Sequence, residues 1–196
     1  MQNKFGLQTS EYSLFFDRLA KLYAGMDSEY KKAADYYSFH CTGCKDNCCL
    51  TRFYHHTFLE YLYILRGCES LDPETKTDVV EKASELCRKS DDADEKGMKL
   101  RIMCPLNFSG MCVLYDYRPM ICRLHGIPHE LHMPGRDVFY GSGCEFFTDQ
   151  SEGKNYFKFD RTPFYFEMSR LETELKRSAG IIRKMKMTVA QMLLPE

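Results

Sequence analysis

The chain has 196 residues, of which 44% are hydrophobic and 28% charged, and its formal net charge is −1. This length and composition are typical of a globular protein with one domain. The near-neutral charge argues against a nucleic-acid-binding function, and no apolar run approaches the roughly 20 residues that a membrane-spanning helix needs.

The chain contains ten cysteines, and their expected role depends on the compartment of the protein. The first stretch, MQNKFGLQTSEY, has no charged start followed by an apolar segment, so we expect no signal peptide and a cytoplasmic protein. In a reducing compartment cysteines are more often metal ligands than disulfides, whereas in a secreted chain the same number would indicate a disulfide framework. The sequence therefore favours metal ligands.

Two helices are expected at the N-terminal end. After a loose start over residues 1–8, Ser10 can cap a helix, Gly25 is expected to interrupt it, and Asp27 or Ser28 can cap a second one. The apolar residues recur at helical spacing, which predicts a core-facing stripe: Tyr12, Phe15, Phe16, Leu19, Leu22, Tyr23, Tyr30, Ala33, Ala34 and Tyr37.

The stretch CTGCKDNCC places four thiols within nine residues: Cys41, Cys44, Cys48 and Cys49. Core packing gives no reason for thiols so close together, whereas thiolates at C-x2-C spacing can bind one ion or one cluster. Cys48 and Cys49 are adjacent, so their side chains diverge in a regular backbone. One of them can bind while the other packs, or each can serve a different site.

The next segment is expected to begin with a short extended stretch, LTRFYHH, followed by two helices. Thr57 and Glu60 form a capping-box pattern, and Gly67 is a natural stop. The second helix is expected to begin at Asp72, a favourable N-cap residue, followed by Pro73, which suits the first helical position. Its apolar face would hold Val79, Val80, Ala83, Leu86 and Cys87, so Cys87 is expected in the core. Cys68 is likewise left outside the metal site. The stretch SDDADEKG at 90–97 is expected to be a surface loop.

A second block supplies four more candidate ligands: Cys104, Cys112, Cys122 and Cys144. Residues 99–115 predict a β-hairpin with strands LRIMC and MCVLY and the turn NFSG, which would bring Cys104 and Cys112 near its mouth. Pro119 suits the first turn of a short helix carrying Cys122. DVFY is a candidate third strand, and the glycines beside Cys144 would let the backbone bend around a metal.

Basic side chains and histidines lie near these cysteines. Arg118 and Arg123 are the preferred partners for the negative charge of a thiolate cluster, ahead of Lys45 and Arg52, because a guanidinium donates several hydrogen bonds. Mixed Cys/His sites are common for zinc. The histidines that could contribute, each with a structural role as the alternative, are His40, His55, His56, His125, His129 and His132.

The C-terminal third predicts a long helix. Thr162 caps it, Pro163 occupies its first turn and Gly180 can break it. Its apolar stripe comprises Phe164, Met168, Leu171, Leu175, Ile182 and Met185. A last segment, TVAQMLL, is expected to pack back on the domain rather than form a subunit contact.

These elements predict a mainly helical α+β fold in one domain, 1–196. A small β-hairpin or sheet and Cys-rich loops would surround a metal centre in a core over residues 38–146. Helical extensions over 9–37 and 162–195 would flank that core.

Several of these motifs together resemble a known family. The stretch CTGCKDNCC (CxxCxxxCC), then CPL, then GMCVLYDYRPMICR and a later lone cysteine resemble the YkgJ-type cysteine-cluster proteins, described as a zinc- or iron-chelating domain. The most specific piece, C-x-[LV]-Y-x-x-R-P-x-x-C-R, is matched over residues 112–123. The resemblance covers about residues 38–146, and it departs at Glu145, where the family often has proline. It implies metal ligation by Cys41, Cys44, Cys48, Cys49, Cys104, Cys112, Cys122 and Cys144.

A cysteine cluster of this kind also occurs in flagellin lysine N-methyltransferases, where it is associated with a [4Fe–4S] centre. That similarity favours an iron–sulfur cluster over zinc, but it does not imply methylation, because no glycine-rich loop for S-adenosylmethionine follows a strand here. Three functions stay open: a redox or cluster-dependent protein with a protein or redox partner, a zinc-stabilised interaction module, and metal handling or storage.

Overall fold

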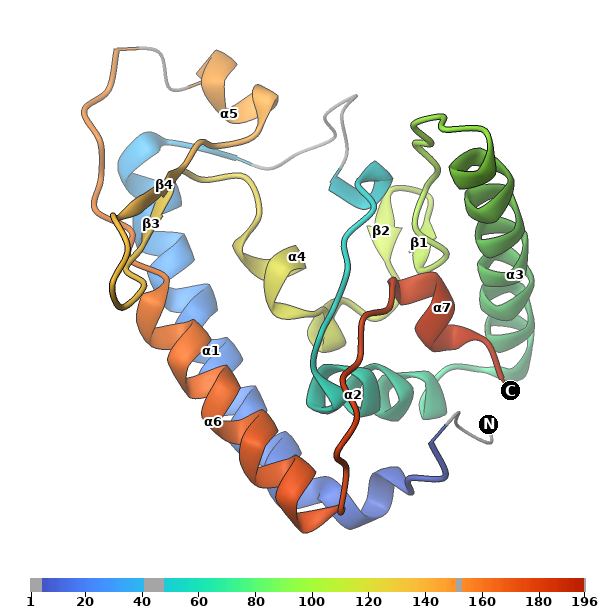
Figure 1. Ribbon diagram of the computed structural model, residues 1–196. Helices are drawn as coiled ribbons and strands as arrows, with labels where there is room; N and C mark the ends of the chain where they lie inside the picture. Colours follow the sequence, from blue (N-terminus) through green and yellow to red (C-terminus); the bar gives the residue numbers. More distant parts are fainter. Residues whose placement is uncertain (1–4, 41–47, 151–152, 196) are drawn as a thin grey trace. The chain divides into compact units, whose positions relative to one another are not determined.

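The computed structural model describes residues 5–40, 48–150 and 153–195 (Figure 1). Within these ranges the chain forms helices and two antiparallel two-stranded sheets, which confirms the predicted mainly helical α+β class. None of the described helices has the length and apolar character needed to cross a membrane. The elements are η1 (Thr9–Tyr12), α1 (Ser13–Tyr37), η2 (Cys48–Leu50), α2 (Phe58–Glu69), α3 (Pro73–Glu95), β1 (Asn107–Phe108), β2 (Met111–Cys112), η3 (Tyr115–Tyr117), α4 (Met120–Leu124), β3 (His129–Leu131), β4 (Phe139–Gly141), α5 (Glu145–Gln150), α6 (Thr162–Ser178) and α7 (Val189–Leu193).

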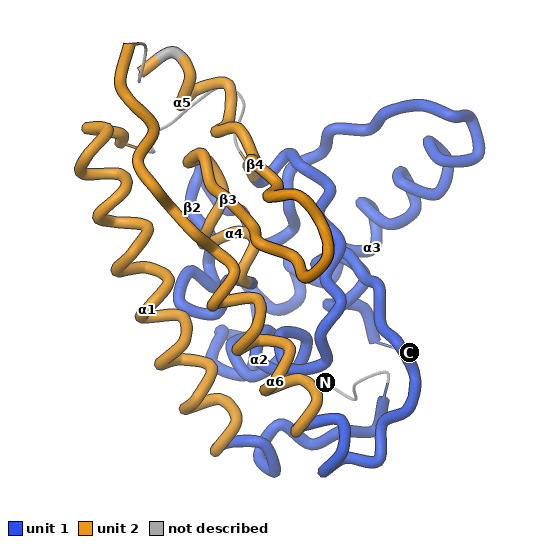
Figure 2. The backbone as a smooth tube through the Cα atoms, turned by 60° about the vertical axis from the view of Figure 1, so that its left-hand side comes forward, with its two compact units in different colours: residues 1–13, 49–119, 175–196 blue, residues 14–48, 120–174 orange. Residues whose placement is uncertain are grey.

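Two compact units make up the chain (Figure 2). Unit 1 comprises residues 1–13, 49–119 and 175–196, and unit 2 comprises residues 14–48 and 120–174. Each unit is therefore assembled from segments that lie far apart in the sequence. The expected core over 38–146 contributes segments to both units, and the expectation of a single domain stays a prediction.

In unit 2, α1 is one helix of 25 residues, so the predicted interruption at Gly25 is wrong. A glycine inside a helix costs only about 1 kcal/mol relative to alanine, which the burial of an apolar face outweighs. Asp27, expected as a cap, instead pairs with Arg123. The predicted stripe is confirmed at five buried residues of α1, Phe16, Leu19, Tyr23, Ala33 and Tyr37, and α1 also buries Met26, which the stripe did not include.

Helix α6 lies alongside α1 (Figures 1 and 2), where Nη1 of Arg18 approaches Oε2 of Glu174 at 2.6 Å. Within the helix the predicted stripe is confirmed at Met168, Leu171 and Leu175, which are buried, whereas Met185 is buried but lies beyond the end of the helix. The helix ends at Ser178, before Gly180 with its φ of 65°. Ile182 is consequently outside the helix and 97% exposed, so its placement in the stripe is wrong.

Unit 2 also contains the β3–β4 sheet, in which His129 pairs with Gly141 and Leu131 with Phe139. The expected strand DVFY, residues 137–140, overlaps β4 and is thus confirmed over that overlap. On its other side β3 is hydrogen-bonded to the segment before α6, because Glu130 N–H donates to the Phe159 carbonyl at 3.0 Å. The histidines at 125, 129 and 132 do not share a helix face, since β3 contains one of them and a loop the others.

In unit 1, α2 begins where its cap predicts: the Thr57 hydroxyl accepts a hydrogen bond from Glu60 N–H at 3.3 Å. The predicted stop at Gly67 is wrong, because α2 continues to Glu69. A Cβ at Gly67 would lie 2.6 Å from the ring of Tyr117 in η3. Gly67 therefore allows a close approach of helix and ring rather than ending the helix.

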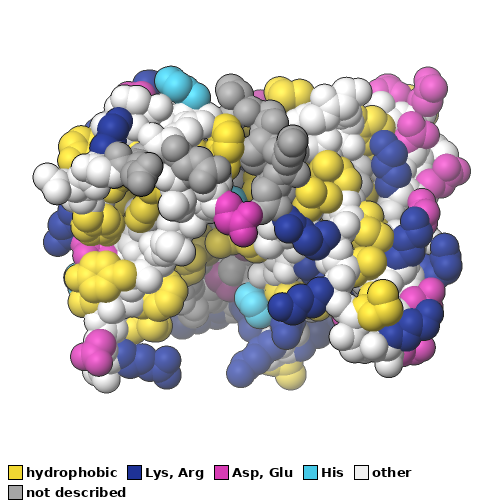
Figure 3. All heavy atoms as spheres, turned by 90° about the horizontal axis from the view of Figure 1, so that it is seen from above, with side chains coloured by type: hydrophobic (Ala, Val, Ile, Leu, Met, Phe, Trp, Pro, Cys, Tyr) yellow, Lys and Arg dark blue, Asp and Glu magenta, His cyan; other side chains and the backbone are white. Residues whose placement is uncertain are grey.

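Helix α3 starts at Pro73 with Asp72 accepting from Thr75 N–H at 2.9 Å, as predicted. The expected loop over 90–97 is wrong, because α3 runs to Glu95 and buries Ser90 and Ala93. Acidic and basic side chains are interspersed over α3 (Figure 3, right-hand side), which is typical of a solvated helix face. The expected packing of TVAQMLL is confirmed, since α7 contacts α3 and buries Ala190, Met192 and Leu193.

The predicted hairpin is present but short, with Asn107 opposite Cys112 and Phe108 opposite Met111. Its turn residues Ser109 and Gly110 have φ of 50° and 87°, as a type I′ turn requires. Residues 100–104 are not a strand, because Pro105 follows Cys104 and cannot donate to a ladder. The hairpin therefore carries Cys112 on β2, while Cys104 precedes β1.

Candidate metal centre

Three cysteines from both motif blocks lie next to one another in unit 1. Cys104 N–H donates to the Cys49 carbonyl at 2.8 Å, which links the second block to the first. The Cys104 carbonyl in turn accepts from Asn107 N–H at 2.9 Å, and Asn107 is the strand partner of Cys112. Chain segments that are more than 50 residues apart are thus joined at these thiols.

Burial raises the pKa of two of these thiols, Cys104 and Cys112, and so favours their protonated form. It raises the pKa of Cys104 to about 12, and the neighbouring Cys49 and Cys112 add to the shift. Burial also raises the pKa of Cys112, against which the positive charge of Arg118 acts. A metal that binds here must displace these protons. Its positive charge would then balance the negative charge of the thiolates.

Cys68 is a further thiol near this group, which the sequence places outside the site. It lies on α2, 3% exposed, and burial raises its pKa to about 11 with a smaller contribution from Cys112. No spacing in the sequence indicates this neighbour, because α2 and β2 meet only in the tertiary structure.

The other motif cysteines occupy different surroundings. Cys48 lies in η2 immediately before Cys49, and Cys122 lies on α4. Cys144 precedes α5, and its N–H donates to the Gly126 carbonyl at 3.0 Å. Cys41 and Cys44, with Lys45, lie outside the described residues.

The glycine beside Cys144 has a packing role. A Cβ at Gly143 would lie 2.5 Å from the Phe147 ring and 2.8 Å from the Gly126 carbonyl oxygen. Gly143 therefore allows a close approach of chain segments inside unit 2, and the expected bend around a metal stays a prediction.

The two arginines expected beside the metal differ in their contacts. Arg118 lies 3.5 Å from the centroid of the Tyr115 ring and influences the pKa of Cys112, so it is positioned near the unit 1 thiols. Arg123 is 8% exposed, and its Nη1 lies 2.7 Å from Oδ2 of Asp27. A contact of Arg123 with a metal cluster stays a prediction.

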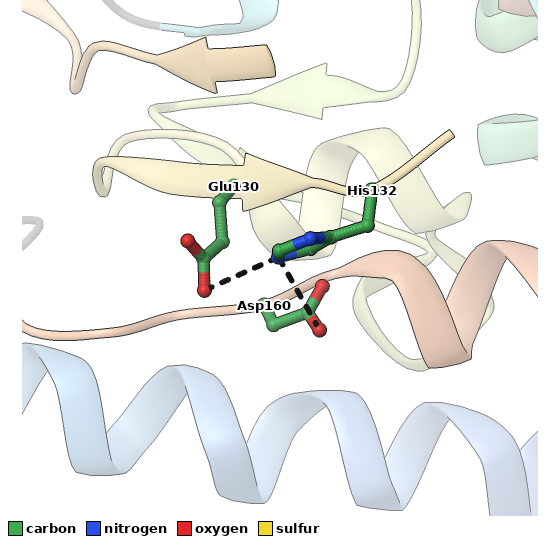
Figure 4. Close-up of side chains that lie close together, drawn as sticks. All are labelled: Glu130, His132 and Asp160. Carbon is green, nitrogen blue, oxygen red and sulfur yellow. Dashed lines mark ion pairs between the residues drawn. The ribbon is translucent and has the colours of Figure 1, made fainter. Parts of the chain in front are cut away.

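Among the histidines, His55 has a structural environment. It is buried, and its backbone pairs with Met187 through two hydrogen bonds of 2.8 and 3.0 Å. His132 instead lies beside two carboxylates, Glu130 and Asp160, that the sequence reading did not single out (Figure 4). The pair Glu130 and His132 has the alternate spacing of one strand face, but nothing in the sequence links Asp160 to them.

The donor set of unit 1 suits a soft metal, because buried thiolates select zinc or iron–sulfur clusters. Among the described cysteines, no three sulfur atoms gather within 4.8 Å of one another. No family model, curated protein or solved structure matches this chain.

Proposed function

We propose that this chain is a metal-binding cysteine-cluster protein that carries an iron–sulfur cluster, [4Fe–4S], with a redox or cluster-dependent role. The observation that carries the proposal is the backbone junction of Cys49 with Cys104, beside Cys112. It unites the two motif blocks that the resemblance to YkgJ-type proteins implies. The ligands would be drawn from these three residues and from Cys41, Cys44, Cys48, Cys122 and Cys144.

The preference for a cluster over a single zinc ion rests on the similarity to the cysteine cluster of flagellin lysine N-methyltransferases, which is associated with a [4Fe–4S] centre. A cluster binds each thiolate through a separate iron atom, so its ligands can lie farther apart than the sulfur atoms around one zinc ion.

We infer that such a cluster would act in electron transfer or in chemistry at an iron with an open position. Burial and hydrogen bonds to the sulfur atoms set the reduction potential of such a cluster. A protein redox partner and a reducing, cytoplasmic compartment would suit this role, since ten cysteines stay available as ligands there.

Zinc bound as a structural ion is the second candidate. It is favoured by the β1–β2 hairpin, which presents Cys112 close to Cys104 as small zinc modules do. In that case all ligands would be internal, and surface helices would contact a protein partner.

Anaerobic purification followed by analysis of iron, zinc and acid-labile sulfide tests the proposal. We expect a brown protein with comparable iron and sulfide, and we expect Cys104→Ser and Cys122→Ser to lower both. Cys87→Ala, on α3, should leave the metal content unchanged and serves as the matched control. A colourless protein with stoichiometric zinc and no sulfide would overturn the cluster and support the structural module.

A further inference from the structure

A second group of side chains that could bind a metal lies in unit 2, and it contains no cysteine. Glu130 comes from β3, His132 follows that strand, and Asp160 lies in the segment before α6 (Figure 4). Nε2 of His132 lies 3.5 Å from Oε1 of Glu130 and 3.9 Å from Oδ2 of Asp160. One imidazole nitrogen and two carboxylate oxygens thus converge within 4.8 Å.

Backbone hydrogen bonds fix the positions from which these side chains project. Glu130 is paired with Tyr140 of β4 on one side, and its carbonyl accepts from Arg161 N–H at 3.0 Å on the other. His132 N–H donates to the Thr162 hydroxyl at 2.7 Å, and Oδ1 of Asp160 accepts from Thr162 N–H at 2.8 Å. Oδ2 of Asp160 is left to face the imidazole.

Glu130 indicates that a cation belongs here. The residue is 4% exposed, and its Oε1 atom is buried without a hydrogen-bond partner among the described residues. Nζ of Lys158 and Nε2 of His132 are each 3.5 Å from this oxygen, beyond the 2.7–2.9 Å or so of a charge-assisted hydrogen bond. A buried carboxylate oxygen left in this state is costly, and a bound metal ion would satisfy it.

We infer that Glu130, His132 and Asp160 bind a divalent cation of the zinc type, separate from the cysteine cluster. A tetrahedral ion about 2.1 Å from each ligand atom sets neighbouring ligand atoms roughly 3.4 Å apart, so the observed separations require only small movements. The His132 side chain is 42% exposed, which leaves the fourth position to water. Lys158, 73% exposed, can swing away when the ion binds.

Zinc binding by purified protein with its thiol-bound metal left in place tests this site. Equilibrium dialysis against buffered Zn²⁺ should show one additional zinc per chain. X-ray absorption at the zinc edge should find nitrogen and oxygen neighbours at about 2.0–2.2 Å rather than only sulfur at about 2.3 Å. His132→Ala and Glu130→Gln should each weaken this binding at least about tenfold, because even losing a supporting group around a metal costs that much.

Two exposed residues outside the group provide matched controls. His56→Ala and Asp137→Asn remove an imidazole and a carboxylate elsewhere, and neither should change zinc affinity. The iron and sulfide content should stay unchanged in every variant, which separates this site from the cysteine cluster.

An ion-pair cluster around a protonated His132 is the alternative arrangement of these side chains. It predicts no additional zinc in the wild-type protein, or equal zinc binding by wild type, His132→Ala and Glu130→Gln. Either result would overturn the inference. His132→Ala changes an exposed side chain, so its result does not depend on whether the buried Glu130→Gln variant folds.

Discussion

An ion pair in unit 2 shows how a charged residue of the cysteine motif serves the fold. The guanidinium of Arg123 is buried, lies 4.2 Å from the centroid of the Tyr23 ring and pairs with Asp27 at 2.7 Å. It joins α4 to α1, because its two partners come from that helix. Removing the carboxylate alone leaves the buried guanidinium unpaired, and this costs more free energy than the intact pair contributes to stability.

Asp27→Asn should therefore lower the free energy of unfolding by about 1–2 kcal/mol, less than for a fully buried pair because the Asp27 side chain is 47% exposed. Urea denaturation measures the change. Asp17→Asn, an exposed carboxylate on the same helix, should stay within about 0.5 kcal/mol of wild type. Equal stability of both variants would mean that the pair contributes nothing to the fold.

At the scale of elements, two helix-interior glycines have opposite roles. Gly25 lies inside α1, where an added Cβ would have its nearest neighbour, a Phe164 ring atom, at 4.0 Å. Gly67 lies inside α2, where a Cβ would come within 2.6 Å of the Tyr117 ring. Alanine gains the same helix propensity at both positions. The space around the added methyl group therefore decides whether the substitution stabilises or destabilises the protein.

Gly25→Ala should raise the free energy of unfolding by up to about 1 kcal/mol, and Gly67→Ala should lower it by about 1–3 kcal/mol. Thermal and urea unfolding of the two variants measures both. The pair is its own control, because each variant makes the same chemical change inside a helix. Stabilisation by Gly67→Ala would show that Tyr117 moves away without cost.

For the whole molecule, histidines that are buried or half-buried contribute to the response to acid. Burial lowers the pKa of His55, which neighbouring Glu60 partly opposes, and burial together with the charge of Arg161 lowers the pKa of His125. A histidine with a lowered pKa takes up protons more readily in the unfolded chain. Stability therefore increases with pH and is lost as pH falls below the ordinary histidine value of about 6.5.

As the pH is lowered from 7.5 to 5.5, we expect the free energy of unfolding, measured by urea denaturation, to fall by up to about 1.4 kcal/mol per pH unit for each such histidine. His55→Gln should reduce this dependence, whereas His56→Gln, at an exposed neighbour, should retain it. Carboxylates with lowered pKa, such as Asp94 beside Arg52, act in the same direction but only at lower pH. A flat stability curve over this range would contradict the prediction.

Short-range signals in the sequence determined much of the secondary structure. The caps at Thr57 and Asp72, the proline at 73 and the Ser109–Gly110 turn each act through hydrogen bonds or dihedral angles within a few residues. Ligation by both cysteine blocks would require chain segments more than 50 residues apart to meet, and the backbones of Cys49 and Cys104 are hydrogen-bonded to each other. Which of the eight motif cysteines bind metal stays a prediction.

Only the tertiary structure decided the features that depend on a distant neighbour. Inside α2 the missing side chain of Gly67 leaves room for the Tyr117 ring, and Cys68 lies near Cys112 because α2 and the hairpin share unit 1. Asp160 reaches Glu130 and His132 because β3 hydrogen-bonds to the segment before α6. The physical reason is one of scale: a local preference is worth about 1 kcal/mol, and the burial and pairing of distant segments outweigh it.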